Sequence, residues 1–413
     1  MRARSRRRTG AIVVSPPYCK LTMTMDRYPL RTLFLVTSMP VGGAETLLVN
    51  LVRRLDRRRF APEIVCLKEA GPLGEMLAAE MRVHTHLLTS KWDLRVLPRL
   101  WRVMRIPRAD AVVTVGAGDK MFWGRLAARL AGVPVVASAL HSTGWPDGVG
   151  RLNRLLTRWT DAFIGVADAH GQHLVENERF PAGKVHVIHN GIDSERFKPR
   201  DASAMRQSLG LAADAPVIGI LAALRPEKNH ELFLAGASCI AERVPAAQFL
   251  VVGDGPLRAR LEAIAGELRI ADRVHFLGSR SDVPEVLAAC DLVALTSHNE
   301  AAPVSILEAL STGVPVVAAD VGSVRETVID GVTGRVFPAG DLDAYVAAAM
   351  ELLGDAAARA RMGAAGRQLV QERWSLEAMV RGYEQLIQRI YDGKFRGAAS
   401  GSPAGLTPVG ETG

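Results

Sequence analysis

The stretch SHNEAAPVSILEALSTGVPVV, residues 297–317, joins a polar loop to an expected helix and that helix to an expected strand. Pro303 suits the first position of a helix, because the N–H group that proline lacks would have no partner there. An apolar run follows at 304–310, and Gly313 is a typical helix stop. Residues 314–318 then predict a buried strand. The stretch therefore indicates one helix-and-strand unit of a parallel sheet.

Two glutamates flank the proline, Glu300 in the loop and Glu308 in the second turn of the predicted helix, with seven residues between them. The first N–H groups of a helix, here at Val304 and Ser305, have no intrahelical partner and bind phosphate readily. Glu308 lies about 7.5 Å along the axis from the helix start, which matches the reach from a phosphate to a ribose. The pair predicts a nucleotide sugar, with Glu308 and Glu300 on opposite sides of the phosphates. The alternative is a solvated loop residue and a helix-surface residue.

The same alternation of short apolar runs and longer amphipathic stretches extends along the chain from residue 31. Repeated strand–helix–strand patterning predicts an α/β protein with parallel sheets and helices on both faces. Strands are predicted at 32–37, 62–67, 83–88, 110–116, 133–140, 161–167 and 184–190, and then at 215–223, 247–253, 273–278, 291–296, 314–319 and 333–338.

An Asn-Gly turn and a proline interrupt this rhythm in NGIDSERFKPR, residues 190–200. We therefore expect two doubly wound, Rossmann-like domains facing a central cleft. The expected boundaries are a disordered basic head at 1–30, a first domain at 31–197, a second domain at 198–373, a helix at 374–395 that crosses back to the first domain, and a disordered tail at 396–413.

The 413 residues are 48% hydrophobic and 23% charged, which is enough to bury sizeable cores, and the net charge is +8. A basic chain can meet nucleic acid, an anionic membrane or an anionic substrate. Interleaved aromatic and basic residues of a nucleic-acid module are missing, so we expect no nucleic-acid partner. The four scattered cysteines predict neither a metal site nor a disulfide framework, and favour a cytoplasmic location. No apolar run reaches the ~18 residues of a membrane span.

Polar and glycine-rich clusters follow several predicted strands, where ligands of open α/β sheets bind. In LRPEKN, residues 224–229, Arg225 and Lys228 place two cations in one loop. A guanidinium can fork onto a diphosphate, and an ammonium can act as a point charge beside it. Together they could stabilise a leaving nucleoside diphosphate without a metal, so we expect no metal cofactor. A solvated loop pair is the plainer alternative.

Three weaker signals follow other strands. Gly42 and Gly43 would let the backbone approach a ligand closely, although a Gly-Gly pair is often only a turn. Gly253 and Gly255, in VGDGP, form half of a dinucleotide fingerprint and predict a ligand-facing turn. His141 ends a strand; a lone histidine there is either a structural or a catalytic residue.

Two further patterns have plain explanations. The pair Asp341 and Asp343 resembles a metal-binding motif, but Asp341 is better placed to cap the helix that follows. The stretch 94–108 spaces several arginines by three and four residues, as on one helix face. Such a face is either solvated or in contact with anionic lipid or an acidic acceptor. These arginines are Arg95, Arg99, Arg102 and Arg105.

Taken in series, these clusters resemble the retaining glycosyltransferases of family four, which have the GT-B fold, over about residues 31–392. The most specific match runs from Glu300 through Glu308 to the segment LEALSTGVPVVAADVGSVRETVIDGVTG, and GGAE, NGID, LRPEKN and VGDGP support it. The family commonly has Gly-Phe after the first glutamate, whereas this chain has Ala301 and Ala302. The usual glycine before LRPEKN is Ala223.

The resemblance implies transfer of a sugar, with retention, from a nucleoside-diphosphate sugar such as a UDP-sugar to a hydroxyl acceptor. It implies attack from the side on which the diphosphate leaves, so that no enzyme nucleophile is needed. The implied catalytic group is Glu300, Arg225, Lys228 and His141; the implied donor-binding group is Glu308, Gly42, Gly43, Val304, Ser305, Gly253 and Gly255.

Polysaccharide or glycolipid assembly is the setting that this resemblance implies, with an acceptor that is lipid-linked or a polysaccharide. The protein would then be cytoplasmic, with possible peripheral contact with the inner face of the membrane. A GT-B epimerase or phosphorylase is an alternative enzyme. A catalytically silent protein that binds sugar nucleotides is an alternative from another class.

Overall fold

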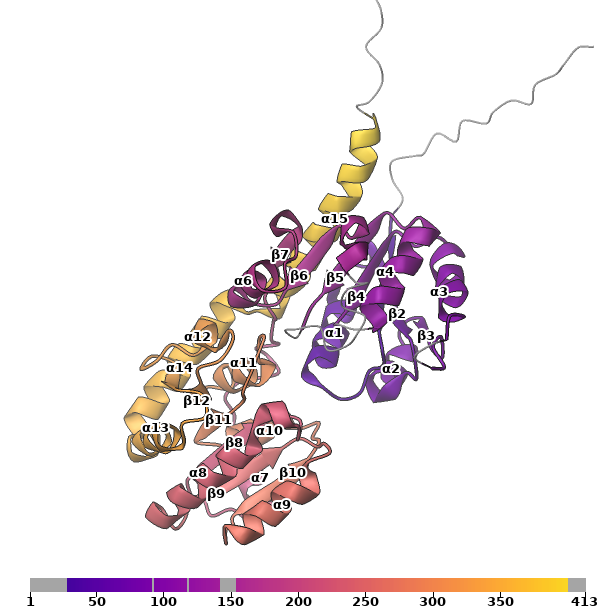
Figure 1. The fold of residues 1–413 in the computed structure, drawn as a ribbon. Coiled ribbons are helices and arrows are strands. Elements are labelled where there is room, and N and C mark those ends of the chain that lie inside the picture. Colours follow the sequence, from indigo (N-terminus) through magenta and orange to yellow (C-terminus); the bar gives the residue numbers. More distant parts are fainter. Residues whose placement is uncertain (1–27, 91–92, 117–118, 142–153, 400–413) are drawn as a thin grey trace, which may run out of the picture.

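A computed structural model describes residues 28–90, 93–116, 119–141 and 154–399 of the chain. It contains two parallel sheets, each flanked by helices, and a long C-terminal helix that runs from one to the other (Figure 1). The expected α/β class and the two Rossmann-like domains are therefore confirmed. Most of the expected head and of the expected tail lies outside the described residues, and Leu30, expected in the head, already belongs to the first strand.

The first sheet has the strand order β3-β2-β1-β4-β5-β6-β7, and all of its pairs are parallel. Its strands are β1 (Leu30–Val36), β2 (Phe60–Cys66), β3 (Val83–His84), β4 (Ala111–Val115), β5 (Val135–Ala139), β6 (Ala162–Gly165) and β7 (Val185–Val187). The helices of this domain are α1 (Gly43–Arg54), α2 (Gly71–Ala78), α3 (Val96–Arg105), α4 (Asp119–Ala131) and α6 (Asp168–Glu176), with short 3-10 turns η1 (Leu156–Trp159) and η2 (Ala182–Lys184).

The second sheet repeats this winding with the order β10-β9-β8-β11-β12-β13. Its strands are β8 (Val217–Leu221), β9 (Gln248–Val252), β10 (Val274–Gly278), β11 (Leu292–Leu295), β12 (Val316–Ala319) and β13 (Gly334–Phe337). Around it lie α7 (Ser203–Ser208), the 3-10 turn η3 (Pro226–Lys228), α8 (His230–Arg243), α9 (Arg258–Glu267), α10 (Val283–Ala288), α11 (Val304–Ser311), α12 (Val324–Thr327), α13 (Leu342–Gly354) and α14 (Ala356–Arg373).

Successive side chains of the central strands pack into opposite layers of the core, as the two-residue period of a strand requires. In β1, Phe34 packs toward α1, whereas Leu33 and Leu35 pack toward α3 and α4. In β8, Ile220 packs toward α8 and α13, whereas Leu221 packs toward α10 and α11. Strands that are buried on both faces read as continuous apolar runs, which is why the sequence predicted them.

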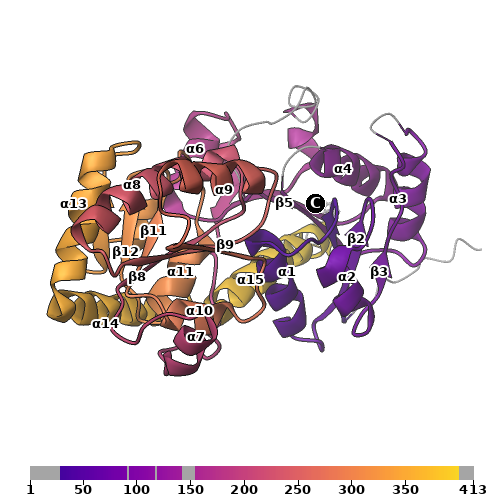
Figure 2. The same cartoon turned by 90° about the horizontal axis from the view of Figure 1, so that it is seen from below.

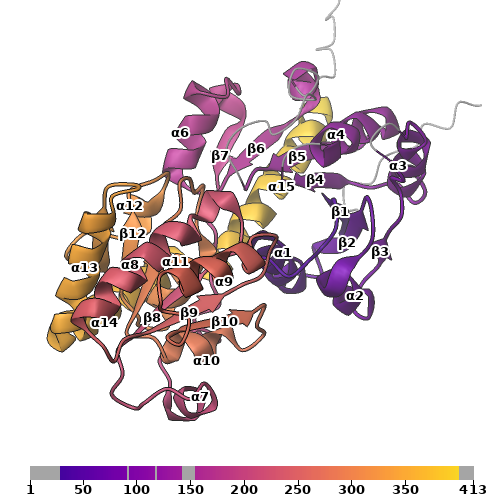
Figure 3. The same cartoon turned by 60° about the horizontal axis from the view of Figure 1, so that its bottom comes forward.

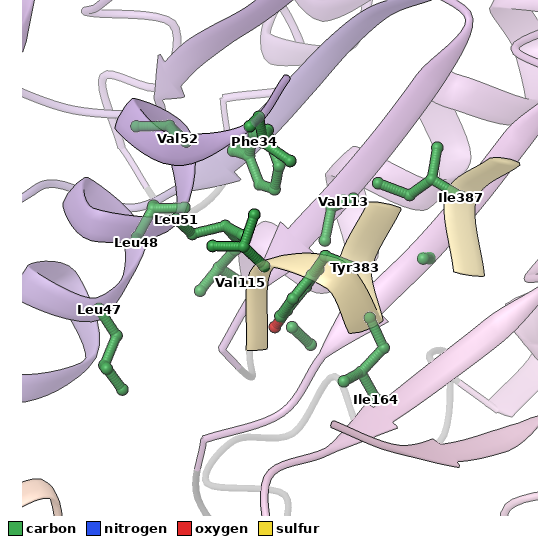
Figure 4. Close-up of a cluster of buried hydrophobic side chains, with 14 of the residues drawn as sticks. Phe34, Leu47, Leu48, Leu51, Val52, Val113, Val115, Ile164, Tyr383 and Ile387 are labelled. Carbon is green, nitrogen blue, oxygen red and sulfur yellow. The ribbon is translucent and has the colours of Figure 1, made fainter. Parts of the chain in front are cut away.

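The last helix, α15 (Leu376–Ala399), belongs to the core of the first domain. Its buried side chains Tyr383 and Ile387 lie among those of α1 and of strands β1, β4 and β6 (Figure 4). Seen from below, the helix crosses from the second domain to the first beside α1 (Figure 2). The predicted crossing is therefore present, and the helix continues past residue 395, where it was expected to end.

Smaller differences have local causes. β12 begins at Val316 and not at residue 314, because Gly313 (φ +82°) ends α11 and the Val314 N–H donates to the Ala309 carbonyl. The predicted strand at 83–88 shortens to β3, since His86 has φ +57°, which breaks extended backbone. Asp341 caps α13 as predicted, accepting a hydrogen bond from the Ala344 N–H at 2.9 Å.

Candidate active site

The two loops that follow β8 and β11 meet at the switch point of the second sheet, where the strand order reverses. The Thr296 hydroxyl donates to the Asn229 carbonyl at 2.9 Å, and the His298 N–H donates to the Glu227 carbonyl at 2.9 Å. These bonds join the Arg225–Lys228 loop to the Glu300 loop. The structure therefore brings together two motifs that are about seventy residues apart in sequence.

Lys228 and Glu300 form an ion pair in this junction. The Lys228 Nζ donates to Glu300 Oε1 at 2.7 Å, and the Ser297 hydroxyl donates to the same oxygen at 2.7 Å. Glu300 is only 7% exposed, so its carboxylate is held in one orientation by two donors. Gly322 closes the site from behind, since a side chain there would collide with the Glu300 carbonyl. Of these partners, Ser297 was not singled out from the sequence.

Arg225 stands at the rim of the same loop. Its guanidinium is exposed and makes no hydrogen bond with the part of the chain that the structure describes. Lys228, by contrast, is half-buried and committed to Glu300. The two cations therefore differ in character: Lys228 is fixed in place, and Arg225 is available to a ligand.

Two helix N-termini, one from each domain, face each other beside this loop (Figure 3). A Cβ built on Gly43, the first residue of α1, would lie 3.5 Å from Val304, the first residue of α11. Neither helix has a side-chain cap, because the preceding residues are Gly42 and Pro303. The N–H groups and positive dipole ends of two helices thus converge on one place, an arrangement that favours a diphosphate.

Glu308 lies on the second turn of α11 and is half-buried. Its carboxylate accepts no hydrogen bond from any residue within the described ranges. Burial raises the pKa of Glu308 to about 7, and Arg196 offsets part of that effect. A carboxylate that is desolvated and has no donor costs free energy, and ribose hydroxyls are donors of the right kind. The expected contact of Glu308 with ribose stays a prediction.

The structure gives Gly253 and Gly255 a packing role. A side chain at Gly253 (φ +137°) would collide with the Ala222 carbonyl, and one at Gly255 would collide with the Leu224 carbonyl. The two glycines therefore let the loop after β9 press against the loop that carries Arg225. Their expected direct contact with a ligand stays a prediction.

His141 lies in the first domain, directly after β5, and is half-buried. It lines a small apolar pocket together with α1 and α15 side chains such as Leu47, Met379 and Tyr383. The catalytic role of His141 stays a prediction.

One group among the described residues has the spacing of metal ligands: Asp168, His189 and Glu326, whose ligand atoms lie within 4.8 Å of one another. It lies at the domain junction and shares no residue with the loops of Arg225 and Glu300. Glu326 already accepts two backbone N–H groups there. The expectation that the reaction needs no metal stays a prediction.

The order and winding of the two sheets define the GT-B class of two-domain transferases. A solved structure of Anabaena HepE in complex with UDP and glucose superimposes with a TM-score of 0.78 at 23% identity, over 87% of this chain and all of that chain. The family model described as "Glycosyl transferases group 1" matches residues 201–369, and the model described as "Glycosyltransferase Family 4" matches residues 41–196.

Two relatives extend this match. One is the UDP-Gal:alpha-D-GlcNAc-diphosphoundecaprenol alpha-1,3-galactosyltransferase of Escherichia coli, 27% identical over 78% of this chain and 87% of the relative. The other is the GDP-mannose-dependent alpha-(1-6)-phosphatidylinositol monomannoside mannosyltransferase of Mycolicibacterium smegmatis, 34% identical over 68% and 76%. The chain belongs to glycosyltransferase family 4. It is a hexosyltransferase that takes its sugar from a nucleotide, and neither alternative enzyme nor a silent binding protein finds support.

Proposed function

We propose that this enzyme transfers a hexose from a UDP-sugar to a hydroxyl of a lipid-linked acceptor, with retention of the anomeric configuration. The observation that supports it most directly is the layout along α11. A donor-free carboxylate, Glu308, lies one turn from an uncapped helix start, and the paired Glu300 and Lys228 lie just before that start. Ribose, diphosphate and sugar would occupy these three positions in order.

In this arrangement, the residues of the site have separate roles in binding and transfer. Glu308 accepts the ribose hydroxyls, and the starts of α1 and α11 donate N–H groups to the diphosphate. Arg225 and Lys228 stabilise the charge that grows on the diphosphate as the bond to the anomeric carbon breaks. Glu300 keeps Oε2 for the sugar hydroxyls, because Lys228 and Ser297 occupy Oε1.

Retention follows from attack on the face from which the diphosphate departs. The acceptor oxygen bonds to the anomeric carbon while the carbon–phosphate-oxygen bond breaks. The acceptor proton passes to the departing phosphate oxygen, which becomes more basic as it leaves. The chain supplies orientation and fixed positive charge in this scheme, and no side chain forms a bond to the sugar.

A thermal-shift screen tests the donor. UDP, GDP and ADP would each be added at matched concentration, with hydrolysis of the corresponding glucose and mannose conjugates followed in parallel. We expect UDP to raise the unfolding temperature most, since ligand at about 100 times its Kd stabilises a protein by about 2.7 kcal/mol. A larger rise in unfolding temperature with GDP would mean that the donor carries guanine and not uracil. Binding without any release of sugar to water or acceptor would favour the silent alternative.

A lipid-linked acceptor requires the enzyme to reach a bilayer, and we propose the outer face of α3 as the contact. No helix in the described parts of the chain is long and apolar enough to cross a membrane. On α3, Val96, Leu100 and Met104 are buried. The opposite face exposes Leu94 (71%) and Trp101 (39%), with Ile106 (67%) at its end.

Arginines lie among these exposed apolar side chains, and the segment 94–108 contains no acidic residue. Arg95, Arg102 and Arg105 are exposed, but Arg99 turns inward to Asp93 at 2.8 Å. Three of the four arginines predicted for this face therefore point to solvent. Exposed apolar side chains interspersed with arginines suit an anionic bilayer, because the apolar side chains can insert while the charges meet lipid headgroups. A solvated face would not require the exposed apolar side chains.

Replacing Arg102 and Arg105 with glutamate should weaken binding to vesicles of phosphatidylglycerol. At about 1 kcal/mol for each basic residue lost near an anionic surface, the loss is at least about thirtyfold. Co-sedimentation with phosphatidylglycerol and with phosphatidylcholine vesicles measures it. The matched control reverses Arg243 and Arg373, two exposed arginines on other helices. Equal losses in both double variants would mean that net charge, and not α3, governs the contact.

A further inference from the structure

Helix α6 of the first domain is capped by a carboxylate from the second domain. The residue before α6 is Ala167, which has no side chain that could accept from the first N–H groups. Glu326 of α12 takes that place, accepting from the Asp168 N–H at 3.1 Å and from the Ala169 N–H at 2.7 Å. α6 and α12 are neighbours in Figures 1 and 3. A cap that is normally local is therefore supplied across the domain junction.

His189, in the segment after β7, adds charge to this contact. Its Nε2 lies 3.3 Å from Asp168 Oδ2 and 3.7 Å from Glu326 Oε2. The hydrogen bond with Glu326 raises the pKa of His189, and Asp168 adds to that effect. The same surroundings lower the pKa of Glu326, so its carboxylate is held in the charged form that a helix N-terminus favours.

A second polar contact joins the domains a few residues away. Asn190 is buried, and its Nδ2 donates to the Ala302 carbonyl at 3.2 Å. Ala302 directly precedes Pro303, the residue from which α11 starts. Asn190 is therefore bonded to the same short loop that carries Glu300, and it fixes that loop relative to the first domain.

Asn190, Ala302 and Glu326 also line one small pocket at the domain junction. Hydrogen bonds are directional, so the bonds of Glu326 and Asn190 help to fix the orientation of the two sides of this junction.

We propose that Glu326 and Asn190 are positioning residues that hold the two domains in the orientation needed for sugar transfer. The diphosphate position is built from α1 of one domain and α11 of the other, so a small rotation between the domains would separate its two halves. Arg225, Lys228 and Glu308 all lie in the second domain. Transfer should therefore depend on these two residues much more than nucleotide binding does. The identity of the nucleotide rests on the proposed function.

The test compares three measurements on the full chain carrying Glu326→Ala. Calorimetry should show a smaller loss of UDP affinity than of turnover, because Arg225, Lys228 and Glu308 stay together in one domain. Release of UDP from UDP-glucose should slow by about tenfold or more, since a misplacement of about 1 Å can cost up to about a hundredfold. Small-angle scattering without ligand should show a larger radius of gyration. Asn190→Ala should give the same pattern.

Two variants control for general damage to the fold. Glu351→Ala removes a glutamate that pairs with Arg335 inside the second domain, at 3.2 Å, and should leave all three measurements unchanged. Glu326→Gln keeps an oxygen for the α6 N–H groups but removes the charge, so its UDP release should lie between those of the unchanged protein and the alanine variant.

Unchanged turnover and an unchanged radius in Glu326→Ala and Asn190→Ala would overturn the proposal. So would losses of turnover and of UDP affinity by the same factor. If the unchanged protein binds no UDP, the proposed donor is wrong, and the scattering comparison still decides whether the two residues orient the domains.

Discussion

Replacing Lys228 with alanine should lower the rate of transfer by about a hundredfold to a thousandfold, the usual cost of losing one donor to developing charge. The structure fixes Lys228 through its ion pair with Glu300 at 2.7 Å, and the proposed function places the diphosphate beside it. Steady-state release of nucleoside diphosphate measures the loss. Lys228→Arg should recover only part of the rate, because a planar fork does not reproduce a point charge.

The same substitution leaves a buried carboxylate unpaired, which by itself destabilises a protein by about 3–5 kcal/mol. A double variant, Lys228→Ala with Glu300→Gln, separates the two effects. It should regain most of the lost stability, because no buried charge is left, and it should stay inactive. Lys198→Ala, at an exposed lysine paired with Glu195, is the matched control.

Excess chelator should leave the rate of the unchanged enzyme intact, since Arg225, Lys228 and the two helix starts supply the positive charge. Two results would contradict this account of the diphosphate site. One is a Lys228→Ala variant within a few-fold of the normal rate. The other is a rate that chelator abolishes and magnesium restores.

Glu308→Gln should stabilise the free protein at pH 8 while weakening its affinity for UDP. Burial raises the pKa of Glu308 to about 7 from an ordinary value of 4.5. The folded state therefore holds this proton between those two pH values, and stability falls as pH rises through them. Above pH 7 the full cost is present, about 3 kcal/mol at most. Glutamine avoids this cost, so the two proteins should have similar free energies of unfolding near pH 4.5, and the glutamine variant should be the more stable one at pH 8.

The affinity of Glu308→Gln for UDP should fall, although its stability rises. Hydrogen bonds to a charged acceptor are worth about 1.5–3 kcal/mol against about 1 kcal/mol for a neutral one, so Glu308→Gln should weaken UDP binding by roughly tenfold. For the unchanged protein, the affinity for UDP should rise from pH 6 to pH 8, because hydroxyl donors favour the ionised carboxylate. Chemical denaturation and calorimetry across this range measure both trends.

Glu300→Gln is the matched control for the ribose contact. It should leave UDP affinity nearly unchanged and reduce turnover, since the proposed function places Glu300 on the sugar side of the phosphates. If the Glu300 and Glu308 variants lose UDP affinity equally, the division between a sugar glutamate and a ribose glutamate is wrong.

The sequence predicted those features that a short segment determines. Buried strands such as β4 and β8 are continuous apolar runs, and Asp341 marks the start of α13 by its own side chain. The proximity of Lys228 and Glu300 also followed, because both motifs come after strands of one parallel sheet. The structure adds that the strands β8 and β11 are neighbours and that Ser297 supports the ion pair.

The contacts across the domain junction could not be predicted from the sequence. The partners of Glu326 are about 157 residues away, and nothing near Ala167 in the sequence signals that α6 lacks its own cap. From the sequence, Asn190 was interpreted only as part of an Asn-Gly turn. Gly253 and Gly255 looked like ligand contacts because a close approach to backbone and a close approach to a phosphate require the same residue.

The position of α15 affects how this protein is made. Helix α15 follows the whole second domain in sequence, yet its side chains complete a core layer of the first domain. During synthesis, part of one face of the first domain's sheet therefore stays uncovered until α15 has left the ribosome, after the whole second domain. The final folding step of the first domain therefore follows synthesis of the second. A prematurely ended chain would consequently leave the earlier-made domain, and not the later one, with exposed apolar surface for chaperones and proteases.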